Sequence, residues 1–192
     1  MTKTVYDISM SLDGFINARN PRPEEGLGDG GERLHEWAFA SEDAQNKELL
    51  ARAWGFGAMI AGRFTYDLSV PYWGPNGPTG TARVPTVVVT HDAPQDVPEN
   101  HVYTFVKSVE EAAKKAGQIA GTKDIAVMGG KSIGSQFLQA GLLDEVSVHL
   151  VPVLFGGGTR LFDEFDEKHV QLETIDVVNT KEAVHLQFRV IK

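Results

Sequence analysis

The sequence predicts an α/β domain with a largely parallel sheet and an antiparallel edge at its C-terminal end. Short apolar segments alternate with helix-like segments through most of the chain. The segment TVVVTH (86–91) has consecutive β-branched residues, which is typical of a strand covered on both faces. Residues 170–192 have the pattern of two strands joined through Asn179 and Thr180. We find no repeat and no linker, and expect one domain over residues 1–192.

The individual elements follow from local patterns. We expect strands at 4–10, 58–62, 86–91, 101–105, 124–130 and 144–158, the last broken by Pro152. We expect helices at 33–54, with a break where Ser41 caps the second half, from 63 to just before Pro71, at 108–120 and at 132–141. Residues 11–32 are rich in Gly, Asn and Pro, and a loop of this length in a compact domain tends to be functional or disordered.

Composition and charge exclude several classes of protein. The 192 residues carry a formal net charge of -8, which argues against nucleic acid or an anionic membrane as partner. The absence of cysteine excludes disulfides and thiolate metal sites. The N-terminus lacks the apolar core of a signal peptide, and no apolar stretch approaches the roughly 18 residues of a membrane span. We expect a cytoplasmic protein that acts on a small molecule and holds no metal.

Gly129 and Gly130 follow a buried strand and precede a helix. Glycines there allow the backbone to approach a ligand closely. The free N–H groups of the helix's first turn and the charge of Lys131 favour a phosphate group. The alternative is an ordinary strand-to-helix turn. The spacing of a Walker loop is absent.

Two further strand ends have similar chemistry. Gly62 ends one strand and is followed by Arg63 and Thr65, and Thr90 and His91 end another. In open α/β sheets, ligands bind outside the carboxyl ends of the strands. The coincidence of three such ends predicts a groove for a dinucleotide.

Five segments occur in the order and spacing of the dihydrofolate reductase superfamily: ISMSLDGFI, AGRFTY, VVVTH, IAVMGGKSIGSQFL and LDEVSVHLVPVLFGGGTRLF. The chain resembles the branch that contains the reductase domain of bacterial riboflavin biosynthesis proteins, over nearly its whole length. The resemblance implies a dihydrofolate reductase-like fold with a mainly parallel sheet of about eight strands flanked by helices. It also implies NADPH as the hydride donor and, as in many members, a homodimer.

The resemblance assigns the cofactor contacts. Ser9 and the loop Asp13–Asn17, with Gly14, Phe15 and Ile16, would line the nicotinamide. Phosphates would meet Gly62, Arg63 and Thr65, and the adenosine 2′-phosphate would lie between Thr90 and His91. The pyrophosphate and ribose would contact Met128, Gly129, Gly130, Lys131, Ser132, Ile133 and Gln136. A cis peptide between Gly129 and Gly130 is also implied.

The catalytic residues transfer less directly. The buried acid of dihydrofolate reductases falls near Asn46, so Asp43 becomes a candidate, although a solvated helix charge is the more common role for such a residue. Asp13 either supplies a proton or fixes its loop by accepting backbone N–H bonds. Ser147 and His149 alternate with apolar residues and share one strand face, which by resemblance lines the substrate cavity. His149 is the leading proton donor, with a satisfied core histidine as the alternative.

Other positions bear on the substrate. Gly134 stands where the reductases have an aromatic residue, which would open space beside the nicotinamide. Arg160, beside three glycines at 156–158, would meet a substrate phosphate or lie in a dimer-contact turn. Five aromatic residues are candidates to roof the pocket, although we assign Trp54 to the core: Trp37, Phe39, Trp54, Tyr72 and Trp73.

The sequence therefore predicts an NADPH-dependent oxidoreductase. Its substrate would be a pteridine or a heterocycle like 5-amino-6-(5-phosphoribosylamino)uracil. No His/Cys zinc pattern of a deaminase is present, so a role in riboflavin synthesis would be the reductase step alone. The alternatives are a non-catalytic NADP-binding module and a true dihydrofolate reductase.

Overall fold

The computed structural model describes residues 2–162 and 169–192, and these form one eight-stranded sheet in the order β4-β3-β2-β5-β1-β6-β8-β7. Each of the first six strands pairs in parallel with its neighbours among them, whereas β8 is antiparallel to β6 and β7. The predicted fold class is confirmed. The strands are β1 (Thr4–Ser11), β2 (Ala58–Gly62), β3 (Thr86–Val89), β4 (Tyr103–Val106), β5 (Ile125–Met128), β6 (Glu145–Val151), β7 (Leu172–Asn179) and β8 (Val184–Val190).

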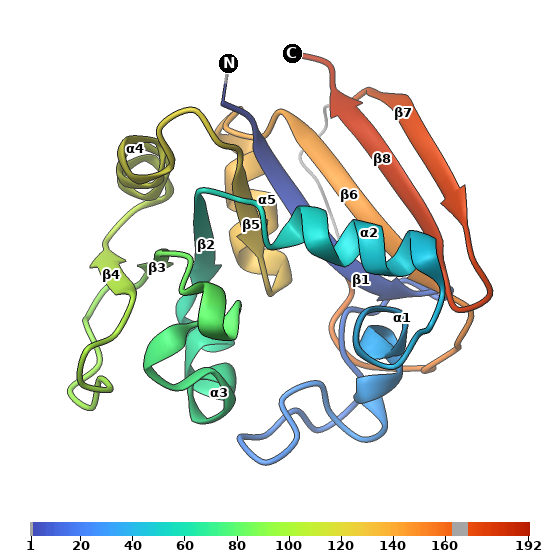
Figure 1. Cartoon of the computed structure of the whole chain (residues 1–192), viewed down its shortest axis with the longest axis horizontal. Helices are drawn as coiled ribbons and strands as arrows, with labels where there is room; N and C mark the ends of the chain where they lie inside the picture. Colours follow the sequence, from blue (N-terminus) through green and yellow to red (C-terminus); the bar gives the residue numbers. More distant parts are fainter. Residues whose placement is uncertain (1, 163–168) are drawn as a thin grey trace.

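Helices cover both faces of this sheet. The helix α5 (Lys131–Gln139) lies behind the sheet and α2 (Ala44–Ala53) in front of it (Figure 1). The helix α4 (Val109–Ala120) packs beside α5, while α1 (Glu36–Phe39) and α3 (Arg63–Trp73) complete the set. Short 3₁₀ helices occupy Gly31–His35, Gly74–Asn76 and Gly80–Ala82. Among the helices of the described residues, none is both long and apolar enough to cross a bilayer.

The face of the sheet toward α4 and α5 is apolar. Tyr6 of β1, Val127 of β5 and Val148 of β6 are buried there against Ile133 and Phe137 of α5. Because successive strand residues point to opposite faces, the intervening residues lie on the other side. This apolar cluster is the largest of the core.

The opposite face of β1, β6 and β8 is polar. Ser9 lies beside His149 in the β1–β6 register, and His149 lies beside His185 in the β6–β8 register. All three are buried. The polar side chains of the strands therefore gather under α1 and α2 instead of facing solvent.

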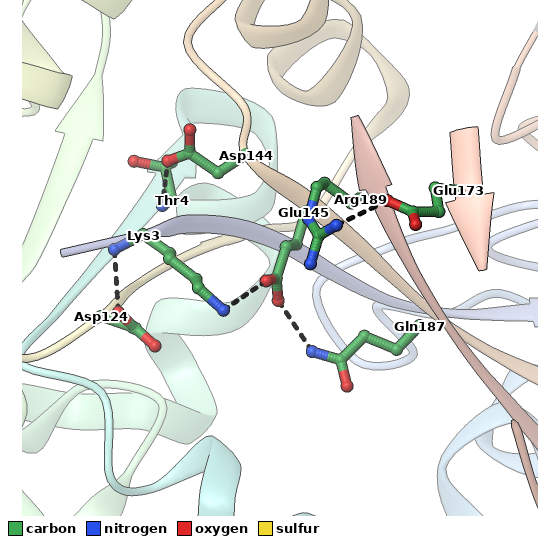
Figure 2. A network of polar contacts seen from close by, with 8 residues as sticks. All are labelled: Lys3, Thr4, Asp124, Asp144, Glu145, Glu173, Gln187 and Arg189. Carbon is green, nitrogen blue, oxygen red and sulfur yellow. Dashed lines mark hydrogen bonds and ion pairs between the residues drawn. The ribbon is translucent and has the colours of Figure 1, made fainter. Parts of the chain in front are cut away.

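A network of polar contacts holds the start of β1 between β5 and β6 (Figure 2). The Lys3 ammonium donates to the buried Glu145 carboxylate at 2.6 Å, and this hydrogen bond raises the pKa of Lys3. Gln187 of β8 donates to the same carboxylate at 2.7 Å. The Thr4 amide donates to Asp144 at 2.9 Å. These bonds join the ends of three strands and so fix their register.

Several expected element boundaries were wrong. The strand expected at 144–158 ends at Val151, and the one expected at 124–130 ends at Met128. Asp43, not Ser41, is the N-cap of α2, because its carboxylate accepts from the Gln45 and Asn46 amides. Pro71 lies inside α3, in its last turns, where its missing N–H removes only one intrahelical bond. The strand predicted at 86–91 ends at Val89, which leaves Thr90 and His91 beyond it.

The space expected at Gly134 is filled. A Cβ at this residue would lie 2.4 Å from the Tyr6 ring, whose hydroxyl donates to the Gly129 carbonyl at 3.1 Å. The aromatic ring that the resemblance placed on α5 is replaced here by one that reaches across from β1. Gly134 therefore serves helix–sheet packing and opens no cavity.

Alanine at Gly134 should destabilise the fold by about 1–3 kcal/mol, because the added methyl overlaps the buried Tyr6 ring. Gly117, inside α4, has no atom within 4 Å of an added Cβ, so Gly117→Ala should stabilise by about 0.5–1 kcal/mol. Urea unfolding of both variants measures the difference. Equal stabilities would contradict the assigned packing role.

Candidate active site

A cavity of about 570 Å³ lies over the polar face of the sheet. Its floor includes Asp7 and Ser9 of β1, Met128 at the end of β5, and His149 of β6. Residues of α1, α2, α3 and the loop before α1 form its walls. The cavity therefore lies where the carboxyl ends of parallel strands meet their covering helices, the usual place for a ligand site in such sheets.

The glycine pair lies at one end of this cavity, and its two members differ. Gly129 has a φ of +91°, and a Cβ there would lie 2.2 Å from the Thr65 hydroxyl oxygen. Gly130 donates its N–H to the same oxygen at 3.1 Å, but a Cβ on Gly130 would lie 3.9 Å from it. The peptide between them is trans, so the expected cis bond was wrong. Packing requires glycine at 129, whereas at 130 the protein itself leaves room for a side chain.

Two helices begin at neighbouring strand ends without a side-chain cap. The N-cap of α3 is Gly62 and that of α5 is Gly130, and neither offers a side-chain acceptor. In contrast, Asp43 caps α2 and Ser108 caps α4. At neither helix start does an N-cap side chain therefore compete with an anionic ligand for the backbone N–H groups of the first turn.

Arg63 links the ends of β2 and β3. Its Nε donates to both oxygens of Asp67 at 2.7 and 2.8 Å, and its Nη1 donates to the Asp92 carbonyl at 2.7 Å. Nη1 also lies 3.3 Å from the Thr90 hydroxyl. His91, which follows Thr90 in the sequence, is exposed. The three strand ends of the predicted groove are adjacent, since β3, β2 and β5 are neighbours in the sheet.

The predicted cofactor residues divide into two groups. Those that line the cavity are Ser9, Ile16, Thr65, Met128, Gly129 and Gly130. Those outside its lining are Gly14, Phe15, Gly62, Arg63, Thr90, His91, Lys131, Ser132, Ile133 and Gln136. Ile133 is buried in the apolar core, and Gln136 donates to the Ser132 hydroxyl at 2.9 Å. The second group surrounds the starts of α3 and α5 and the loop 12–17.

Asp13 fixes its loop. Its carboxylate accepts from the Ser11 hydroxyl at 2.6 Å and from the Gly156 amide at 2.8 Å, and the Ser11 bond is the main cause of its lowered pKa. A Cβ at Gly158 would lie 2.1 Å from the Asn17 carbonyl oxygen, so the glycines at 156–158 allow the two loops to pack together. This geometry fits the structural alternative for Asp13.

Two other predicted site residues also lie away from the cavity. Asp43 is engaged as the cap of α2. Arg160 is exposed and lies over the Phe15 ring, 4.8 Å from its centroid. Ser147 faces a second, more polar cavity of about 440 Å³, which His149 and Asp7 also line.

His149 lies in a chain of buried polar side chains. Its Nδ1 is 2.7 Å from His185 Nδ1, and its Nε2 is 3.3 Å from Asp7 Oδ1. His185 Nε2 is 2.8 Å from Asn46 Oδ1. The Asn46 amide nitrogen donates to Glu182 at 3.0 Å and to the Ser41 hydroxyl at 2.8 Å.

The rings around this chain are packed tightly. The Trp37 ring lies 4.1 Å from that of His149 between centroids, and its Nε1 donates to Ser9 at 2.9 Å. Burial, with a smaller contribution from His149, lowers the pKa of His185 to about 4. Burial is also the main cause that lowers the pKa of His35 to about 4. His35 and His185 are therefore neutral near pH 7.

The sequence did not single out Asp7, His35 or His185 as site residues. For Asp7 and His185, the signal available was the period-two pattern of β1 and β8, in which polar residues alternate with apolar ones. His35 lies on a 3₁₀ helix, where this pattern gives no signal. All five rings of the predicted aromatic set line the cavity. Trp54 was wrongly assigned to the core, because 48% of its surface is exposed at the cavity mouth.

Solved riboflavin biosynthesis proteins share this fold. The family model of the RibD C-terminal domain matches residues 2–186, and the chain belongs to that family. The family expected from the sequence motifs is thereby confirmed.

Individual relatives are distant. Protein YyaP of Bacillus subtilis (strain 168) is 24% identical over 185 residues, which are 93% of this chain and 88% of YyaP. A putative riboflavin biosynthesis protein from Shewanella sp. PV-4 superposes with a TM-score of 0.73 at 20% identity, covering 100% of both chains. A Thermotoga maritima diaminohydroxyphosphoribosylaminopyrimidine deaminase/5-amino-6-(5-phosphoribosylamino)uracil reductase gives a TM-score of 0.66 at 12% identity, covering 99% of this chain and 57% of that one.

Stability should fall as the pH drops from about 6.5 to about 4, because His35 and His185 bind protons more weakly in the folded chain than in the unfolded chain. NMR titration should show both rings protonating near pH 4. Urea unfolding at about pH 7 and about pH 5 measures the loss, which His35→Gln should reduce. Titration of both rings near 6.5, the value for free histidine, would contradict this assignment.

Proposed function

We propose that this protein is an NADPH-dependent reductase of a planar nitrogen heterocycle. The observation that carries the proposal is that the glycine pair after β5 and the Asp7–His149 pair line the same cavity. One end of the cavity thus has the features of a dinucleotide site, and its floor has groups able to donate a proton. The family membership supports a reductase role.

The residues present fit NADPH. The room beside Gly130 and the uncapped starts of α3 and α5 suit a pyrophosphate, and Arg63 beside Thr90 suits the 2′-phosphate. When bound, NADPH would supply a hydride. The chain's own residues would hold the cofactor's phosphates at the strand ends and keep water from the reacting atoms.

The walls of the cavity favour a flat substrate without phosphate. Seven Phe, Trp and Tyr rings among the described residues line it, and Phe39 and Tyr72 are 72% and 63% exposed, free to stack on a ligand. Within the described part of the chain, the charged residues of the lining besides its histidines are four acids and no lysine or arginine: Asp7, Glu24, Glu25 and Glu32. Such walls attract a neutral or protonated heterocycle and repel a phosphorylated one. Of the two expected substrates, a pteridine fits better than a phosphoribosylaminouracil.

The alternatives have less support. A non-catalytic NADP-binding module would not need titratable groups on the cavity floor. A true dihydrofolate reductase needs an arginine for the folate tail. Arg83 is the arginine nearest to that position of the family, but its side chain is bonded to Asn76 and to the Asn100 carbonyl. We also propose a homodimer, since β7 exposes Leu172, Ile175 and Val177 at the sheet edge. Light scattering measures the mass of the protein in solution, which should be twice that of one chain.

The wild-type protein should bind NADPH and oxidise it with pterins faster than with aminopyrimidine ribotides. Gly130→Ala should abolish NADPH binding while leaving the fold intact, because the new methyl occupies space that the protein leaves open. Fluorescence titration measures binding, and absorbance at the reduced nicotinamide band measures turnover.

Gly117→Ala serves as the control, since it adds the same methyl on α4, where an added Cβ has nothing within 4 Å. Unchanged NADPH affinity in a folded Gly130→Ala variant would reduce the glycine pair to an ordinary turn. Absence of NADPH binding by the wild type would refute the proposed function.

Arg63→Ala should weaken NADPH binding roughly ten- to a hundredfold and affect NADH less, since a charge-assisted hydrogen bond contributes about 1.5–3 kcal/mol. The Asp67 carboxylate shares the guanidinium, so the smaller end of this range is expected. Arg189→Ala, at the opposite end of the sheet, is the matched control. Equal losses for both cofactors would remove Arg63 from the 2′-phosphate site.

A further inference from the structure

The row of buried hydrogen bonds that ends at His149 has a fixed direction of donation. Glu182 determines which atom donates in each bond. A carboxylate only accepts hydrogen bonds, so the atom of Asn46 that faces it at 3.0 Å is the donating amide nitrogen. The carbonyl oxygen of Asn46 therefore faces His185 Nε2 at 2.8 Å. That ring nitrogen must carry the hydrogen of this bond.

The direction continues through the two histidines. A neutral imidazole has one N–H, so His185, with its hydrogen on Nε2, offers a lone pair at Nδ1. His149 Nδ1 lies 2.7 Å away and must be the donor. A neutral His149 would then present a second lone pair, at Nε2, to the Asp7 carboxylate 3.3 Å away. Two acceptors do not form a hydrogen bond, and this contact requires one more proton.

The additional proton lies between His149 and Asp7, because the other members of this hydrogen-bonded row do not take it. Burial keeps His185 and His35 neutral near pH 7, because it lowers the pKa of both rings to about 4. The charged or titratable groups that face the His149–His185 pair from the packed elements are Asp7 on β1, His35 on the 3₁₀ helix, Asp43 at the start of α2 and Glu182 before β8.

We infer that Glu182, Asn46 and His185 are positioning residues that hold the His149 proton on Nδ1. As a result, His149 Nε2 and Asp7 Oδ1 share one transferable proton on the cavity floor. His149 is 4% exposed, whereas the Asp7 side chain is 27% exposed and lines both cavities, so the pair can be refilled from solvent.

This shared proton has a role in the reduction, and this step rests on the proposed function. When a hydride adds to the carbon of a substrate C=N bond, the π electron pair moves to nitrogen, which must gain a proton. The proton comes from the His149–Asp7 pair. The pair is left as a neutral imidazole and a carboxylate, and solvent returns one proton before the next cycle.

The first test needs no substrate. Long-range ¹H–¹⁵N NMR of the free protein near neutral pH distinguishes a protonated ring nitrogen from one with a lone pair. We expect a proton on His149 Nδ1 and on His185 Nε2. A lone pair on His149 Nδ1 in the wild type would overturn the inference.

Glu182→Gln tests the origin of the direction. A glutamine amide can donate to Asn46, so Asn46 is free to turn and the chain to reverse, which moves the His149 hydrogen to Nε2. Glu173→Gln, at an exposed residue on β7 next to β8, is the matched control and should leave the ¹⁵N pattern unchanged. An unchanged His149 pattern in Glu182→Gln would contradict the role of Glu182.

Asp7→Asn tests the shared proton in turnover. Asparagine can donate to His149 Nε2, which preserves the contact without a transferable proton, so kcat should fall about a hundredfold with NADPH affinity unchanged. Full activity in this variant would remove the pair from catalysis. If NADPH fails to bind while His149 Nδ1 is protonated, the proposed function is refuted, whereas the inferred position of the His149 proton is supported. If NADPH binds and Nδ1 is unprotonated, the inference alone fails.

Discussion

The alternation of side chains along β1, β6 and β8, held in a single register, is the constraint on which the rest of the structure depends. It places Tyr6 and Val148 against α5 and places Asp7 and His149 over the cavity. A shift of one residue would turn the charged set into the apolar core, so the register cannot slip without loss of both core and site. The contacts of Lys3 and Glu145 at the start of β1 (Figure 2) fix this register four residues before Asp7 and His149. Core, register and site are therefore consequences of the same pairing.

The sequence was sufficient for the features that local patterns determine. Runs of β-branched residues predicted the buried strands, and glycine, hydroxyl or basic residues at the strand exits predicted the three adjacent ends of β2, β3 and β5. Contacts between distant segments could not be predicted. His149 meets His185 across 36 residues and Asp7 across 142, and neither separation leaves a local pattern. Gly134 looked like an opening because nothing on its own helix shows that Tyr6 fills the space from β1.

Asn46 shows how the chain departs from the dihydrofolate reductases it resembles. An acid at this position would be unable to donate to Glu182, and the two carboxylates would repel each other at 3.0 Å. A carboxamide both donates and accepts, so it passes the orientation set by Glu182 to His185. In this arrangement the missing acid of α2 does not indicate a lost activity. In the proposed mechanism the acidic function lies instead on β1, where Asp7 faces His149.

The distribution of charge separates the two reactants that a reductase must hold. Arg63 and the uncapped starts of α3 and α5 lie at the strand ends, where the phosphates of a dinucleotide would bind. Inside the cavity, Asp7 and the glutamates at 24, 25 and 32 make the walls acidic. A basic heterocycle that enters such walls is stabilised in its protonated form, because an opposite charge nearby favours the charged state. In the proposed reduction, the negative charge of these walls also stabilises the substrate nitrogen as it accepts the proton of the His149–Asp7 pair. The same carboxylates that repel a phosphorylated substrate therefore prepare an unphosphorylated one for reduction.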